Sequence, residues 1–415
     1  MTRTVLDTIY RAGREPGPPA ANTHVHLPPN FSAFDDVASV VERAREEGVV
    51  AIGTANYFDF RVYRQFAELS AEAGIAALYG TEIITLQEDL QASGVLVNDP
   101  ANPGRTYMCG KAIAAFDTPG TVATSLMTTI RRTSEERMAE MATRLGDCAR
   151  QAGLAEVPVL AEIVSAVAAR NGVPIEWVSL QERHLARALQ EAVFAQVAPE
   201  GRGSLLAALL GGSLDTGAAA DPIALQEAIR SRLMKAGRPA FVPEAAVSFE
   251  DAYRLVLELG GIPCYPTLAD GANPVCAFED PPQDLAQALL GRGVYLAELI
   301  PTRNAPDVVD RYVAAFRAAG ILTLAGTEHN TQRMIPLTPT CRGGAAFSDL
   351  ARTAFWEATC VIAAHQHLRM AGKPGYIEAG GRLASGFVDG DVRIRWFREL
   401  GEQVIAAAAG AGVRA

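Results

Sequence analysis

The stretch Asn22-Thr23-His24-Val25-His26 is the part of this chain that says most about its fold. It places two of the six histidines two residues apart, shortly before a Pro-Pro break. Residues i and i+2 of a β-strand point to the same face, so both imidazoles can converge on one ion. The segment is short, follows an entry rich in proline and glycine, and precedes a helical pattern, which is typical of a first strand. Two polar residues at a strand end are the alternative interpretation.

Length and composition indicate an ordinary globular protein. A chain of 415 residues can bury a large core, or a core plus an appended subdomain. Hydrophobic residues make up 49% and charged residues 20%, which excludes a disordered chain. The net charge of -10 argues against a non-specific nucleic-acid partner or an anionic membrane surface.

We expect neither a cleaved leader nor a disulfide framework. Residues 1–20 are polar and mixed, and no run approaches the ~20 apolar residues that span a bilayer. The six cysteines are scattered without CxxC spacing, so we expect reduced thiols and a cytoplasmic protein. The sequence leaves open whether the chain forms a homo-oligomer.

Short apolar strands alternate with helices from residue 21 to about residue 115. We expect a helix over 35–47, with Ser32 or Asp35 as its N-cap, and a second helix over 62–73. Apolar runs at 49–54 and 75–83 predict strands, the second of which ends on Thr81-Glu82. This βαβαβ order predicts parallel strands.

A helical block interrupts the alternation between about residues 119 and 242. Helices are expected over 135–151, 157–171, 180–197 and 222–236, and a flexible connection over 201–220. The alternation resumes after Ser248. The predicted organisation is therefore one α/β barrel in two parts, 1–118 and 246–345, with a helical cap at 119–245 and C-terminal helices at 346–415.

Polar side chains follow nearly every predicted strand. In parallel α/β folds the carboxyl ends of strands meet at one rim, where functional groups collect. Imidazole and carboxylate groups gathered there suit Zn, Mn or Fe. The strand-end residues are His24, His26, Asn56, Tyr57, Asp59, Glu82, Tyr265, Asp270, Glu298, Arg303, Asn304, Glu328, His329 and Asn330.

Five motifs in order along the chain resemble the PHP (polymerase and histidinol phosphatase) superfamily. They are His24-x-His26, Gly53-Thr54-Ala55-Asn56-Tyr57, Gly80-Thr81-Glu82, Ile262-Pro263-Cys264-Tyr265-Pro266 and Gly326-Thr327-Glu328-His329-Asn330. The resemblance implies a distorted (β/α)7 TIM-like barrel that binds two or three metal ions. It also implies phosphoester hydrolysis through a metal-activated water, and the helical insertion is similar to the caps of some members.

Several family ligands are replaced in this chain. The usual Thr-Asp-His motif stands as Ala55-Asn56-Tyr57, and the Ala-His-Pro motif as Cys264-Tyr265-Pro266. The terminal Asp-x-His stands as Glu328-His329-Asn330, and Tyr107-Met108-Cys109 lies near the place of a further histidine. The unchanged ligands are His24, His26 and Glu82, with Glu328 as a conservative fourth.

The remaining ligands predict a reduced metal site. Two imidazoles and two carboxylates can hold one Zn, Mn or Fe ion with room for water, so we expect fewer than three ions. A second ion would need Asp59, Asp270 or His329 as a ligand.

The leading functional prediction is a metal-dependent hydrolase, with a phosphoester of a small anionic molecule as substrate. Arg303 could clamp that anion, or pair with Asp307. Lys235 and His184 of the cap could touch substrate, or be a solvated helix end and a structural histidine. Tyr57 could hydrogen-bond substrate or fill vacated ligand space. We also assign a catalytic role to His329 and substrate contact to Asn330.

Two other classes stay open on the sequence alone. The lost motifs fit a degenerate, non-catalytic barrel that serves as a binding or regulatory module. The changed ligands also fit a metal-dependent lyase or isomerase with a sugar-like substrate. His365 and His367 lie two apart on a predicted helix, so they diverge, and we expect them to be structural.

Overall fold

The computed structural model describes residues 17–243 and 247–412. Residues 1–16 of the predicted first barrel part and residues 413–415 of the C-terminal segment lie outside the described residues, as do residues 244–246 at the predicted cap boundary.

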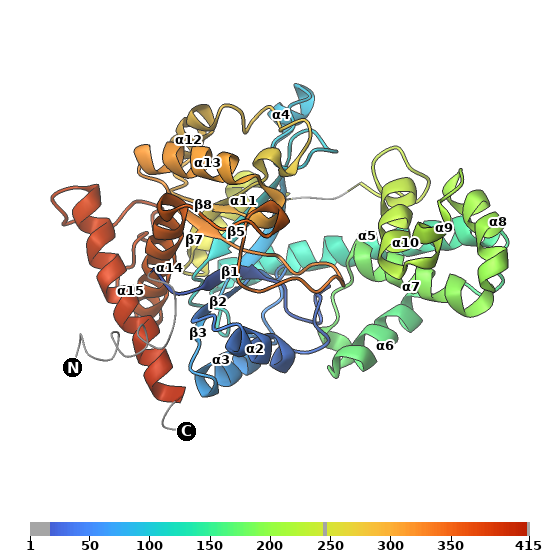
Figure 1. Cartoon of the computed structure of the whole chain (residues 1–415), viewed down its shortest axis with the longest axis horizontal. Coiled ribbons are helices and arrows are strands. Elements are labelled where there is room, and N and C mark those ends of the chain that lie inside the picture. Colours follow the sequence, from blue (N-terminus) through green and yellow to red (C-terminus); the bar gives the residue numbers. More distant parts are fainter. Residues whose placement is uncertain (1–16, 244–246, 413–415) are drawn as a thin grey trace.

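The strands of the described chain form two sheets (Figure 1). The first is parallel, with the order β1 (Ala21–Val25), β2 (Ala51–Thr54) and β3 (Ala76–Leu78). The second has the order β6-β4-β5-β7-β8-β9. Its strands are β4 (Thr81–Leu86), β5 (Arg105–Lys111), β6 (Val247–Ser248), β7 (Ile262–Thr267), β8 (Leu296–Leu299) and β9 (Leu322–Ala325).

The predicted closed barrel is not shown, because the described strands hydrogen-bond as two sheets and not as one ring. Two isolated parallel bridges join the sheets, Val25 with Glu328 and Tyr57 with Glu82. The predicted βαβαβ order with parallel strands is confirmed for β1, β2 and β3, whereas β5 was not predicted. Strand β5 runs antiparallel to both β4 and β7.

The strand predicted over 75–83 divides into β3 and β4 at Gly80. A Cβ atom there would lie 2.4 Å from the Thr54 carbonyl oxygen and 2.9 Å from that of Gly110. Glycine allows this close approach of three backbones, so the chain can leave one sheet and enter the other. Glu82 consequently lies near the start of β4 and not at the end of a strand.

Helices pack around both sheets. They are α2 (Val37–Glu46), α3 (Tyr63–Glu72), α4 (Glu88–Ala92), α11 (Phe249–Glu258), α12 (Pro282–Gly291) and α13 (Pro306–Ala318). The N-cap of α2 is Asp36, whose carboxylate accepts from Ser39 N–H at 2.7 Å, and neither Ser32 nor Asp35 caps it. The apolar faces of these helices bury the core that positions the strand ends.

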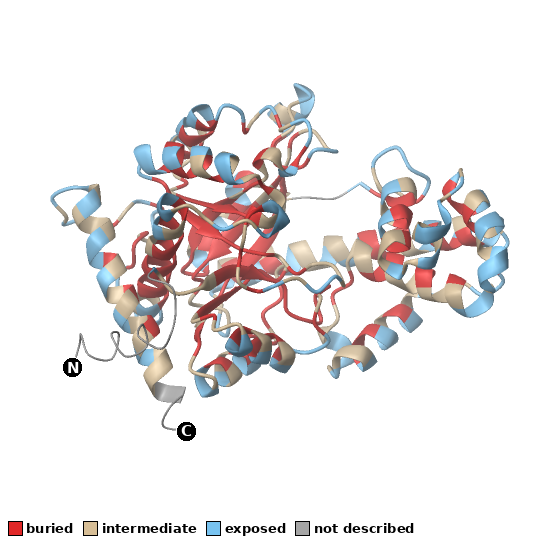
Figure 2. Cartoon of the chain, in the orientation of Figure 1, coloured by how far each residue is buried: buried red, intermediate tan, exposed pale blue. Residues whose placement is uncertain are grey.

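The cap helices form a lobe beside the sheets (Figure 1). Its elements are α5 (Thr121–Gln151), α6 (Leu160–Asn171), η1 (Ile175–Trp177), α7 (Glu182–Gln196), α8 (Pro199–Leu210), α9 (Thr216–Ala220), α10 (Pro222–Ile229) and the π-turn η2 (Arg230–Met234). The flexible connection expected over 201–220 is therefore wrong. Leu206, Leu209 and Leu210 bury one face of α8 in a core that belongs to the lobe (Figure 2).

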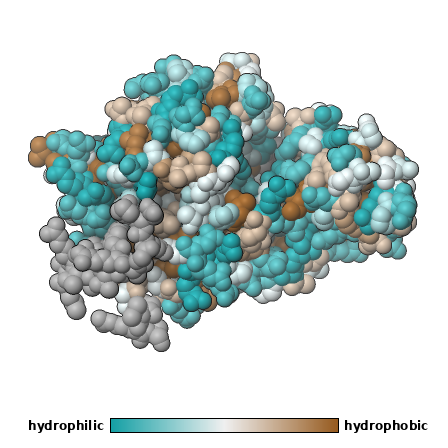
Figure 3. All heavy atoms as spheres, in the orientation of Figure 1, coloured by the Kyte–Doolittle hydropathy of each residue, from teal (hydrophilic) through white to brown (hydrophobic). Residues whose placement is uncertain are grey.

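Two C-terminal helices, α14 (Asp349–Met370) and α15 (Gly390–Gly412), pack against each other and the sheets. His365 is fully buried on α14 and its Nε2 lies 2.9 Å from the Gly260 carbonyl oxygen, whereas His367 is exposed. Among the described helices none is both long and apolar enough for a bilayer. Hydrophilic residues dominate the face drawn in Figure 3.

Two glycines of α15 should respond oppositely to the same substitution. A Cβ on Gly401 would lie 1.8 Å from the Cys360 carbonyl oxygen of α14, whereas none of the described atoms lies within 4 Å of one on Gly410. We expect Gly401→Ala to lower the free energy of unfolding by about 1–3 kcal/mol. Gly410→Ala should be neutral or raise it by up to about 1 kcal/mol. Urea unfolding measures both, and equal effects would contradict the close helix contact.

Candidate metal centre

His24, His26 and Glu82 form one buried cluster of metal-ligand atoms. His24 lies near the end of β1, His26 directly follows that strand, and Glu82 comes from β4 of the other sheet. The two Nε2 atoms lie 3.4 Å apart, and His26 Nε2 lies 3.5 Å from Glu82 Oε2. The structure therefore brings together three of the four predicted ligands.

Glu298 and Lys111 support His24 on the Nδ1 side of its ring, away from the cluster. Glu298 Oε2 lies 2.6 Å from His24 Nδ1 and 2.7 Å from Lys111 Nζ, and its Oε1 accepts from the Thr23 hydroxyl at 2.7 Å. Lys111 Nζ also donates to the Thr23 carbonyl oxygen at 2.8 Å. A carboxylate on Nδ1 favours the tautomer with its proton there, so the lone pair of Nε2 faces the cluster.

Burial and charge set the protonation of the site. Burial alone would raise the pKa of Glu298, but Lys111 and His24 outweigh it and lower the value to about 2. Burial and then the neighbouring His24 lower the pKa of His26, which keeps that imidazole neutral. Burial raises the pKa of Glu82 to about 7, despite the opposing effect of His24.

Tyr57 covers the cluster. Its ring stacks on His26 with centroids 5.4 Å apart, and its hydroxyl hydrogen-bonds Glu82. Burial, followed by the charge of Glu82, raises the pKa of Tyr57, so the phenol stays a neutral donor. Tyr57 thus contacts both kinds of ligand, an imidazole and a carboxylate.

The donor set fits a divalent ion. Two neutral imidazoles and one carboxylate are a frequent three-ligand set of catalytic Zn sites, which leave a further position open, and they also suit Fe(II). Two ring nitrogens facing each other repel where both present lone pairs, and a cation between them removes that repulsion. His26 Nδ1 is buried with no hydrogen-bond partner among the described residues, so no competing bond turns this ring away.

Glu328 lies near the cluster but outside it. Both of its carboxylate oxygens pair with Arg303, and Oε2 also accepts from the Asn330 amide at 2.7 Å. Arg303 therefore pairs with Glu328 and not with Asp307. Glu328 has a left-handed backbone (φ 63°), and its N–H donates to the His24 carbonyl oxygen at 2.8 Å.

Other predicted residues lie away from the three ligands. His329 Nδ1 lies 2.7 Å from the Thr327 hydroxyl and its Nε2 lies 3.0 Å from the Ile335 carbonyl oxygen. His184 accepts from Gln181 N–H at 3.0 Å and packs on Phe31. The remaining candidates bind structural partners: Asp59 with Arg61 and Ser179, Asp270 with Asn304 and Arg342, and Tyr265 with Glu279.

A cavity of about 380 Å³ opens beside the cluster between the sheets and the cap. Glu82, Tyr57, Glu328, Arg303 and Asn330 line one side of it. The cap supplies three cations to the other side, Arg183, Arg230 and Lys235. Lys235 Nζ also pairs with Glu182 at 2.7 Å.

Sequence reasoning missed Lys111, Arg183 and Arg230. Lys111 lies on β5, which was not predicted. One signal was available, because Lys111 stands within the apolar run Cys109-Gly110-Lys111-Ala112-Ile113, and a buried lysine needs a charged partner. The cap arginines lie on helices without any distinguishing pattern.

Comparison with known proteins shows the fold alone. No family model matches the chain, and no curated protein matches its sequence. One similar crystal structure, from Bifidobacterium adolescentis, is named provisionally as a metal-dependent phosphoesterase; it has a TM-score of 0.54 and 18% identity and covers 82% of this chain and 96% of its own. An amidohydrolase from Chromobacterium violaceum, solved with sulfate and no metal, has a TM-score of 0.50 and 17% identity and covers 78% and 93%. The chain thus shares an α/β fold found in metal-dependent hydrolases.

Removing Lys111 should destabilise the fold, and removing its partner's charge as well should rescue it. Lys111→Met leaves the Glu298 carboxylate buried without its cation, so we expect a loss of about 3–5 kcal/mol in the free energy of unfolding. Lys111→Met combined with Glu298→Gln removes both charges and should recover most of this loss. Urea unfolding of the single and double variants measures the coupling, and purely additive losses would contradict it.

Glu182 should make the stability of the cap depend on pH. Burial would raise its pKa, but Lys235 and Arg137 lower it to about 2, below the unfolded value of about 4.5. A carboxyl group whose pKa is lower in the folded state stabilises the protein at pH values above its unfolded-state pKa. This contribution to the free energy of unfolding disappears as the pH falls through the folded-state pKa.

We therefore expect Glu182→Gln to cost on the order of 2–3 kcal/mol at pH 7 and less than half of that at pH 3. Denaturant midpoints at both pH values test this. Glu191→Gln on the same helix is the control, because its arginine pairs are more exposed and should contribute little. An equal cost at both pH values would contradict the assignment.

Proposed function

We propose that this chain is a metal-dependent hydrolase of the PHP type, with a phosphoester of a small anionic molecule as its substrate. The observation that carries the proposal is the His24–His26–Glu82 cluster, with His24 oriented by Glu298. The fold shared with metal-dependent hydrolases is consistent with it. The proposal includes a mononuclear site of Zn, Mn or Fe.

His24, His26 and Glu82 would hold the ion, which supplies Lewis acidity and lowers the pKa of a water molecule toward neutrality. Glu298 accepts the hydrogen bond of His24 Nδ1, which orients the ring so that Nε2 faces the ion. Tyr57 holds the Glu82 carboxylate through its hydroxyl and covers one face of His26, so it limits access of solvent to the ligands.

The cavity favours an anionic substrate. Four cations and three carboxylates line it, and a divalent ion would shift the balance further toward positive charge. Arg303, Lys235, Arg183 and Arg230 can each donate to a phosphate, and Asn330 lies beside them. An anion that binds Arg303 would displace Glu328 and free its carboxylate near Glu82. We propose that Glu328 then acts as the fourth metal ligand.

The Arg303–Glu328 pair also favours a second candidate, a binding module without catalysis. While Glu328 and Arg303 pair with each other, Glu328 does not act as a fourth metal ligand and Arg303 does not clamp an anion. Turnover separates the hydrolase from the binding module, because only the hydrolase converts a substrate. The third class, a lyase or isomerase, would convert its substrate without hydrolysis.

The test is the metal content of protein purified without chelators. We expect about one divalent ion per chain by elemental analysis, and a loss of affinity of at least about tenfold in His24→Ala, His26→Ala and Glu82→Gln. His367→Ala, an exposed histidine of α14, is the matched control and should keep the ion. Absence of a bound ion in the parent protein, or equal metal content in all variants, would refute the site.

Turnover is measured on the same samples with small phosphate monoesters and diesters. We expect activity that EDTA abolishes, that added metal restores, and that His24→Ala lacks. A bound ion without turnover of phosphoesters, lactones or amides would support the binding module.

A further inference from the structure

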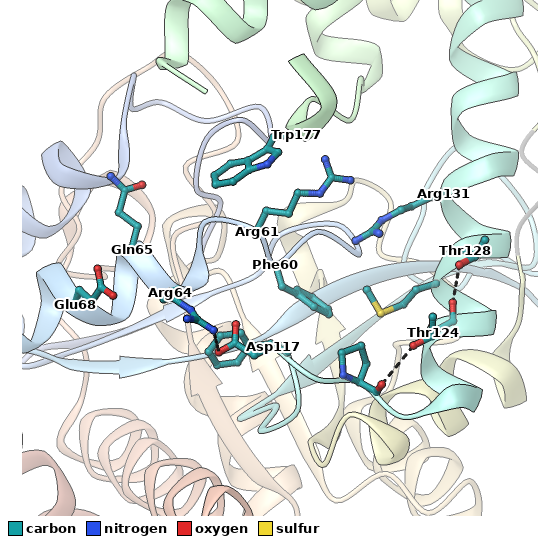
Figure 4. Close-up of a pocket in the computed structure, with 13 residues that line it drawn as sticks. Phe60, Arg61, Arg64, Gln65, Glu68, Asp117, Thr124, Thr128, Arg131 and Trp177 are labelled. Carbon is teal, nitrogen blue, oxygen red and sulfur yellow. Dashed lines mark hydrogen bonds and ion pairs between the residues drawn. The ribbon is translucent and has the colours of Figure 1, made fainter. Parts of the chain in front are cut away.

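A second cavity, of about 610 Å³, lies beside α3 and the first half of α5. Its walls come from α3 with the turn before it, from the segment that follows β5, from the first half of α5, and from η1 of the cap (Figure 4). It shares no lining residue with the cavity beside Glu82. Its volume is within the ~300–1,000 Å³ typical of small-molecule sites.

Three arginines converge on this cavity, against two carboxylates. Arg64 pairs with Asp117 at 3.1 Å, but both side chains are largely exposed, and such pairs are weak and easily exchanged. Arg61 donates to the Glu176 carbonyl oxygen and lies 3.8 Å from Asp59. Each of these guanidinium groups keeps donors for a further anion.

Arg131 is the least satisfied of the three. Its Nη2 donates to the Phe58 carbonyl oxygen at 3.0 Å, while its Nε is buried and has no hydrogen-bond partner among the described residues. No carboxylate pairs with it within the described ranges. Burial lowers the pKa of this guanidinium, because neighbouring groups compensate its positive charge only in part.

Aromatic rings form another part of the wall. Phe60, Phe116 and Trp177 line the cavity, and Figure 4 shows Trp177, Arg61 and Phe60 around the same space. Phe116 is fixed by its contact with Tyr79, at a centroid distance of 4.3 Å. Flat apolar surfaces beside guanidinium groups suit a ligand with both a planar ring and an anionic group.

We propose that this cavity is a second ligand site, which takes a small molecule made of a planar ring and a phosphate, such as a nucleoside diphosphate. Arg131 and Arg61 bind the phosphate, and the ring packs between Trp177 and Phe60. The site is separate from the proposed metal centre, and it does not depend on a bound ion or on turnover.

The test uses ADP as probe, with EDTA present so that the metal centre cannot recruit it. Trp177 is one of three tryptophans, and the other two lie on α14 and α15, so ADP should change the fluorescence of Trp177. We expect a Kd below about 1 mM by calorimetry. Adenosine and inorganic phosphate, which each lack one half of the ligand, should bind at least about tenfold more weakly.

Variants locate the binding. Arg131→Met and Arg61→Met should each weaken ADP at least about tenfold, because a charge-assisted contact is lost. Arg132→Met, the exposed neighbour on α5, and Lys235→Met in the other cavity should bind ADP as the parent does. Failure of ADP to bind at several times the predicted Kd would overturn the proposal. Equal binding by parent, Arg131→Met and Arg61→Met, with all three folded by circular dichroism, would overturn it too.

Discussion

The buried carboxylate of Glu298 is the point on which the site depends. It contacts Lys111 and His24 through one oxygen and the Thr23 hydroxyl through the other. These residues come from β1, β5 and β8, so one carboxylate joins the two sheets. Burying both charges costs free energy, and the close contacts with Lys111 and His24 offset that cost. The benefit is an imidazole with a fixed orientation and tautomer.

That constraint explains why a reduced ligand set can still form a site. His24 is held from behind, Tyr57 stacks on His26, and Tyr57 also bonds Glu82, so each of the three ligands has its own support. Cys109 and Glu298 form a second possible ligand group with His24. The Lys111 ammonium already balances the charge of that group, which argues for one ion.

The sequence predicted the local features well and the long-range ones less well. The spacing of His24 and His26 implies convergence, since it depends only on strand geometry. Helices such as α2 and α3 followed from apolar periodicity. Strand β5 was missed, and one of its two neighbours, β7, lies beyond the whole helical cap in sequence. Lys111, which lies on this strand, was missed as well, and its partner Glu298 is 187 positions away by their residue numbers. Arg303 has several carboxylates within reach along the chain, and only the fold selects Glu328 among them.

Anomalous diffraction from crystals soaked in Zn²⁺ or Mn²⁺ tests the central claim most directly. The account predicts one peak per chain, bounded by His24 Nε2, His26 Nε2 and the Glu82 carboxylate, with Lys111 still on Glu298. A peak between Cys109 and Glu298, or the absence of any peak at the two histidines, would contradict it.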